Sequence, residues 1–129
     1  KVTDKLFLHL LSLQIADNLA KNPVFFPEKK RKLDEVRRVY EKVLAEALAA
    51  TKEMVWRDIN HPSIIMWAFM NEADTGAKEA IPFYTTLIST IREMDSSRLV
   101  TYASNHAEND KCFDLIDVIS VNRYPAFLL

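Results

Sequence analysis

Polar side chains follow three apolar runs of the chain, each at the point where the run ends. They are, in chain order, Asn71 and Glu72; Asn105; and Asn122, Arg123 and Tyr124. A carboxylic acid can donate and accept a proton, while amides, a guanidinium and a phenol can hydrogen-bond hydroxyl groups. Gathered on one rim, these groups would form a site for a sugar or another polar ligand.

The three runs have the pattern of strands in a parallel sheet. Residues 64–70 are apolar without interruption between Pro62 and Asn71, as expected of a strand covered on both faces. Residues 99–103 and 115–121 are two further short runs, and the segment 78–95 between the first two has helical spacing. Alternating strands and helices predict an α/β fold with a parallel sheet. In such sheets the C-terminal strand ends meet at one edge, which would bring the polar residues together.

The first half of the chain predicts two helices. In residues 28–59 apolar side chains recur every three or four positions over about nine turns, and Asn60-His61-Pro62 ends the pattern. The same spacing fits a heptad, so a coiled coil is an alternative. Residues 4–21 also have helical spacing, with an apolar face so broad that it calls for burial or a partner.

Composition excludes several classes of function. The chain has 17 Lys and Arg against 18 Asp and Glu, so it lacks the basic excess expected of a nucleic-acid-binding protein. Its single cysteine, Cys112, and the spacing of its histidines predict no metal site, and its single glycine, Gly76, excludes glycine-rich phosphate loops. We expect no cofactor. No apolar run approaches the roughly 18 residues of a membrane span, and no signal peptide is evident, which slightly favours a cytoplasmic location.

The region from Arg57 to Glu72 resembles glycoside hydrolase family 2. The resemblance lies in the sequence RDINHPSIIMW, which includes Trp67, followed after three residues by Asn71-Glu72. Further similarity, most of all to the β-glucuronidase branch, occurs in the segments MDSSR (94–98), TYASN (101–105) and DVISVNRY (117–124). The resemblance covers residues 53–127 well and 28–52 loosely. We therefore divide the chain into a helical segment, 1–27, without a family match and a glycosidase barrel part, 28–129.

The resemblance implies part of a (β/α)₈ TIM barrel and a retaining exo-β-glycosidase that needs no cofactor. Glu72 would be the general acid/base, and Asn71 would hydrogen-bond the 2-hydroxyl of the sugar. Tyr124 would lie near the nucleophile and the reacting sugar, and Asn105 and Arg123 are further candidates for substrate binding. The substrate would be a terminal β-glucuronide or β-galactoside.

The resemblance also implies that the second catalytic carboxylate is missing. Retention requires two carboxylates about 5–5.5 Å apart. In the family the nucleophilic glutamate follows the seventh strand, whereas this chain would supply only strands four to six with their flanking helices. Glu79 and Glu93 fall in the helix 78–95, and Glu108 falls in a loop, so none replaces it. We therefore expect the isolated chain to be inactive.

Two other functions remain open at this point. Residues 4–59 carry two apolar-striped helices and no chemistry, which suits a non-enzymatic interaction module or a homo-oligomer. A degenerate barrel fragment that binds sugar without cleaving it is the second alternative. Individual residues also have plainer interpretations: Glu72 as a solvated strand end, Tyr124 as a packed aromatic, and Asn105 and Arg123 as hydrogen-bonding loop residues.

Overall fold

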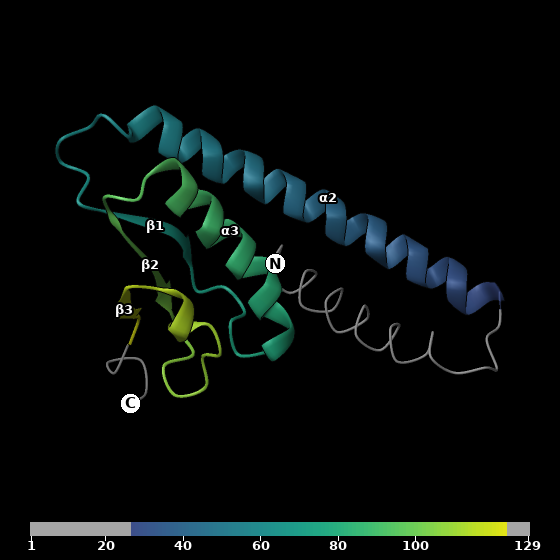
Figure 1. Ribbon diagram of the computed structural model, residues 1–129. Helices are drawn as coiled ribbons and strands as arrows, with labels where there is room; N and C mark the ends of the chain where they lie inside the picture. Colours follow the sequence, from purple (N-terminus) through teal and green to yellow (C-terminus); the bar gives the residue numbers. More distant parts are fainter. Residues whose placement is uncertain (1–26, 124–129) are drawn as a thin grey trace.

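A computed structural model describes residues 27–123, which form a three-stranded sheet with two long helices against one of its faces (Figure 1). The strands are parallel, in the order β1-β2-β3. The elements are α2 (Pro27–Asp58), β1 (Met66–Asn71), η1 (Lys78–Ala80), α3 (Ile81–Met94), β2 (Leu99–Ser104), η2 (Phe113–Leu115) and β3 (Val118–Val121). This confirms the predicted α/β class and parallel sheet. The helix predicted at 4–21 lies outside the described residues.

The long helix α2 agrees with the helix predicted at 28–59. Its C-terminal half packs against α3, and within the described residues its contacts with the core begin at Tyr40, whose ring meets Phe83 edge-on at 6.2 Å. Figure 1 shows the first part of α2 extending past the end of α3. The helix therefore supports the sheet along only part of its length.

The core lies between the helices and one face of the sheet. Trp67 of β1 and Tyr102 of β2 point to this side and are almost completely buried, together with Val55, Ile88 and Ile91 from the helices. Burial of large apolar side chains of this kind supplies most of the stability of a small domain. The core therefore holds β1 and β2 against α2 and α3.

A polar cluster closes the core near the start of β1. The buried carboxylate of Asp95 accepts hydrogen bonds from the Trp67 indole, from both the amide and the hydroxyl of Ser97, and from Arg98. The Arg98 guanidinium also donates to the carbonyls of Ile59 and Ile64. These bonds join the end of α3 to the segment entering β1.

Arg98 and the preceding turn explain why the first strand is shorter than predicted. The Ile64 amide donates to the His61 carbonyl, and the Ile64 carbonyl accepts a hydrogen bond from Arg98. Neither group is therefore available for pairing with β2. Ile65 is 74% exposed. The strand predicted at 64–70 therefore begins only at Met66.

The third strand is shorter for a similar reason. Residues 113–115 form a 3₁₀ turn, in which the Leu115 amide donates to Cys112 and the Ile116 amide to Phe113. Leu115 and Ile116 still pack on the core, and this accounts for the apolar run that suggested a strand from 115. Pairing begins at Asp117, whose amide and carboxylate both bond to the backbone of Val100.

The predicted helix 78–95 is confirmed with a tighter first turn. Residues 78–80 are 3₁₀, and Pro82 stands in the first turn of α3, where its missing N–H costs no helical bond. The helix ends at Met94 because Asp95 adopts an extended conformation.

Candidate functional site

The C-terminal ends of β1 and β3 meet across the end of β2. The side-chain amide of Asn122, just after β3, donates to Oδ1 of Asn71 at 2.9 Å and to Oε1 of Glu72 at 2.8 Å. β2 lies between these strands, so the Asn122 side chain reaches across the end of β2 to make both contacts. The fold therefore brings the amide of Asn71 and the carboxylate of Glu72 together with the amide of Asn122, which lies about 50 residues later in the sequence.

Backbone hydrogen bonds fix both sides of this cluster to β2. The Glu72 amide donates to the Ala103 carbonyl at 2.7 Å, and the Asn122 amide donates to the Ser104 carbonyl at 2.8 Å. Asn71 is exposed, whereas Glu72 and Asn122 are half-buried. The side chains can thus meet a ligand at the rim while the backbone beneath them is fixed.

An irregularity in β1 determines the face on which Asn71 lies. Ala68 pairs with Thr101 and Asn71 pairs with Ala103, so three steps along β1 match two along β2. This is the two-against-one count of a β-bulge, a device often found beside active sites. Phe69 and Met70 both line the helix side of the sheet, and Asn71 comes into register with Ala103 on the opposite face.

Glu72 itself adopts an uncommon backbone conformation. Its φ is +50°, and no other non-glycine residue in the described part of the chain has a positive φ. The left-handed region costs an L-residue about 1–2 kcal/mol, and such strain is found most often at functional sites. It turns the chain sharply just after the strand.

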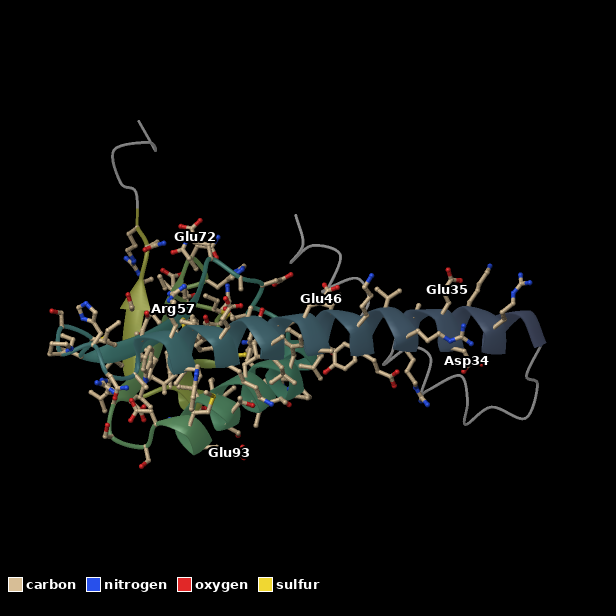
Figure 2. All side chains as sticks on the ribbon, turned by 90° about the horizontal axis from the view of Figure 1, so that it is seen from above. Asp34, Glu35, Glu46, Arg57, Glu72 and Glu93 are labelled. Carbon is tan, nitrogen blue, oxygen red and sulfur yellow. The ribbon has the colours of Figure 1, made fainter. Side chains whose placement is uncertain are left out.

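Glu72 is well separated from Glu93, the one acidic side chain of α3. Figure 2 shows Glu72 and Glu93 on opposite sides of the ribbon. Glu79 lies in η1 and Glu108 in the loop after β2, so neither directly follows a strand of this sheet.

The loop after β2 contains a second acidic centre, Asp110. Its carboxylate accepts hydrogen bonds from four groups that belong to fully buried residues, and no sequence argument singled it out. The donors are the hydroxyls of Thr75, Tyr102 and Ser104 and the amide of Cys112. Because a carboxylate has about four acceptor sites, these donors saturate it.

The buried groups around Asp110 have strongly shifted proton affinities. Burial, and then the nearby Asp110 charge, raises the pKa of the Cys112 thiol to about 12. Burial, with the hydrogen bond to Asp110, raises the pKa of Tyr102 well above its usual range. Both groups therefore stay neutral near pH 7.

The remaining predicted site residues do not join the Asn71–Glu72–Asn122 cluster. Asn105 and Arg123 are exposed just beyond β2 and β3, and neither takes part in the hydrogen bonds that link the cluster. Tyr124 lies outside the described residues. Asn122 was recognised only as a strand-end residue, although its position after a strand is the same signal that identified Asn71.

Between residues 27 and 123, no group of three or more His, Cys, Asp or Glu side chains is arranged to hold a metal ion. No helix in the same range is long and apolar enough to cross a membrane.

Comparison with known families places this arrangement in context. Residues 20–127 match the model for the TIM barrel domain of glycosyl hydrolases family 2. The chain belongs to this family. Its three parallel strands and two helices are accordingly part of a TIM barrel, and the polar cluster lies at the C-terminal face, where active sites of such barrels are found.

Curated relatives narrow the similarity to one branch. The chain is 40% identical over 86 residues to a β-glucuronidase of Paenibacillus borealis and 40% identical over 82 residues to that of Canis lupus familiaris. These matches cover 65% and 63% of this chain but only 14% and 13% of the relatives. The chain thus spans about one-seventh of the length of these relatives.

Solved structures agree with the sequence matches. A β-glucuronidase of an uncultured Clostridium sp. superposes with a TM-score of 0.64 at 34% identity, over 67% of this chain and 15% of its own. The Ruminococcus gnavus β-glucuronidase gives 0.61 at 35% identity, over 65% of this chain and 15% of its own. The latter enzyme has been solved in complex with D-glucuronic acid and with D-glucaro 1,5-lactone.

Proposed function

We propose that this chain carries the acid/base half of a retaining β-glucuronidase-type site. The observation that carries the proposal is the hydrogen-bonded cluster of Asn71, Glu72 and Asn122 at the C-terminal edge of a family 2 barrel sheet. Glu72 would protonate the leaving glycosidic oxygen and then activate the water that attacks in the second step.

The other polar residues at this edge would bind the sugar. Asn71 is exposed and in register with Ala103, which supports a role for its amide in hydrogen-bonding a hydroxyl next to the reacting carbon. Asn122 would hold Glu72 and Asn71 in one arrangement, since it donates to both. Asn105, Arg123 and Tyr124 would contribute substrate contacts at the same rim.

A retaining reaction needs a second carboxylate about 5–5.5 Å from the first. Because Glu79, Glu93 and Glu108 do not follow strands, we expect no glycosyl-enzyme intermediate to form on the isolated chain, and hence no turnover. The proposed division of the chain into a helical part, 1–27, and a barrel part, 28–129, confines the site to the second part.

Ligand binding and an activity assay together test this function. The purified chain is titrated with D-glucaro 1,5-lactone and followed by NMR, with D-galactose as the competing sugar class. We expect the lactone to shift the resonances of Asn71, Glu72 and Asn122, and Glu72→Gln to weaken the effect. An absence of shifts at these residues would contradict the proposal, and larger shifts with galactose would redirect it to β-galactosides.

The assay uses an aryl β-glucuronide with the wild-type chain and with Glu72→Gln. Robust turnover that Glu72→Gln abolishes would refute the expected inactivity. Binding without turnover is the result that we expect.

A further inference from the structure

The chain segment that carries Glu72 is fixed at two points. At its start, the Glu72 amide donates to the Ala103 carbonyl of β2 at 2.7 Å. Three residues later, Thr75 is fully buried, and its carbonyl accepts a hydrogen bond from the Lys111 amide at 2.8 Å. Only Ala73 and Asp74 lie between these anchors, so the position of Thr75 constrains the turn at Glu72.

The second anchor depends on Asp110. The Thr75 hydroxyl donates to Oδ2 of Asp110, which also accepts from the Ser104 hydroxyl at 2.6 Å. The other oxygen of this carboxylate accepts from the Tyr102 hydroxyl at 2.7 Å and from the Cys112 amide at 2.8 Å. One carboxylate therefore ties the segment after β1 to β2 and to the loop after β2.

This connection has a consequence for the positive φ of Glu72. A residue keeps such a conformation only where the surrounding structure imposes it. The hydrogen bond from the Glu72 amide and the burial of Ala73 hold the start of the segment, and the bonds at Thr75 hold its other end against relaxation of the turn. The direction of the Glu72 side chain toward Asn122 thus relies on groups that do not touch the cluster.

We propose that Asp110 is a positioning residue, which acts through Thr75 to hold Glu72 in its left-handed conformation and its carboxylate against Asn122. This inference rests on the acid/base role proposed for Glu72. Asp110 would have no contact with the sugar. Its effect on Glu72 would pass through the segment 72–75. Ser104, whose hydroxyl donates to Asp110 and whose carbonyl accepts from the Asn122 amide, connects Asp110 to the other side of the cluster.

The test compares two variants that remove one buried hydroxyl each from the same carboxylate. Thr75→Val removes the hydrogen bond between Asp110 and the segment that carries Glu72. Tyr102→Phe removes a hydrogen bond between Asp110 and β2. Both are close in shape to the residue they replace. Thr75→Ser, which keeps the hydroxyl, serves as the conservative rescue.

The readouts require no ligand. A positive φ gives a strong NOE between the amide and Hα protons of Glu72, and the contact with Asn122 is reported by the Asn122 side-chain amide resonances. We expect Thr75→Val to lose the strong NOE and shift these resonances, while Thr75→Ser and Tyr102→Phe retain both. The inference is overturned if Thr75→Val retains them, or if Tyr102→Phe loses them to the same extent.

Hydrogen exchange of the wild-type chain provides a second measurement should Thr75→Val fail to fold. If Asp110 couples the two loops, the amides of Glu72, Lys111 and Cys112 will open with the same free energy and the same dependence on urea. Faster, independent exchange at Glu72 would overturn the inference. A wild-type chain with these properties that does not bind the lactone would contradict the proposed function alone.

Discussion

The side-chain amide of Asn122 bridges the last residue of β1 and the residue that follows it, donating to Asn71 Oδ1 at 2.9 Å and to Glu72 Oε1 at 2.8 Å. Both protons of one amide are thereby used. These protons hold the amide oxygen of Asn71 and the carboxylate of Glu72, the two residues that the sequence identified first as site candidates. The bridge connects strands that are not themselves neighbours in the sheet.

Asn122→Ala should disrupt this pair without unfolding the chain. The lost bonds lie at a half-buried rim, so we expect a cost on the order of 1 kcal/mol in the free energy of unfolding. We also expect loss of the lactone-induced NMR shifts at Asn71 and Glu72. Asn60→Ala, a change to an exposed amide that lies before β1 and away from the cluster, is the matched control. Equal loss of binding in both variants would argue against a specific role for Asn122.

The backbone at residue 72 should be more stable with glycine than with alanine. Glu72→Gly and Glu72→Ala lose the same carboxylate, but only glycine tolerates a φ of +50° without strain. We expect the glycine variant to be more stable than the alanine variant by about 1 kcal/mol. Urea unfolding measures the difference, and a more stable alanine variant would show that the backbone relaxes.

Asp95 should make the stability of the chain depend on pH in the acid range. Hydrogen bonds from Ser97, and then from Arg98, hold the pKa of Asp95 well below its usual range. Because the folded state then binds the proton less readily than the unfolded state, the stabilisation is present above about pH 4 and is lost as the pH falls below it. Urea midpoints measured from pH 6 to pH 2 should fall for the wild type.

Asp95→Asn provides the control for this pH dependence. The variant keeps the shape of the side chain but cannot ionise, so it should be less stable at pH 6 and should show a smaller decrease toward pH 2. A pH profile identical to that of the wild type would assign the acid sensitivity to other carboxylates.

Cys112 should be nearly unreactive in the folded chain. The thiol is fully buried and its pKa is raised to about 12, so at pH 8 only roughly one molecule in 10⁴ carries the reactive thiolate. We expect a colorimetric thiol reagent to react slowly in buffer and rapidly in urea. Since the chain has a single cysteine, the signal has one source. Fast reaction without urea would show that the loop around Asp110 opens readily.

Strong periodicity made much of the fold predictable. The spacing of apolar residues located α2 and α3 to within a few residues, and the uninterrupted run ending at Met70 located β1. Strand starts were less predictable, because they depend on distant groups. Ile64 is removed from its strand by Arg98, which lies 34 residues later, and the apolar Leu115 and Ile116 reach the core from a turn.

The candidate site was predictable only in part. Glu72 and Asn71 were found because they follow a buried strand within a recognisable motif. The partnership with Asn122 depends on the order of the strands, which places β1 and β3 on either side of β2. Asp110 has no such signal, since it lies within a polar loop and its importance comes from four donors that only the folded chain assembles.

The bulge in β1 means that the chemistry of this edge depends on a count of residues as well as on their types. In a regular strand every second side chain lies on the same face. Asn71 would then lie on the face of Trp67 and Phe69, and its amide would be directed at the helices. The additional residue reverses that parity after Ala68. Deleting either Phe69 or Met70 would therefore give a regular strand that keeps Asn71 opposite Ala103, whereas pairing both residues regularly with β2 would turn Asn71 toward the helices. The face on which Asn71 lies thus follows from how the two residues are paired, and residue identity alone does not reveal it.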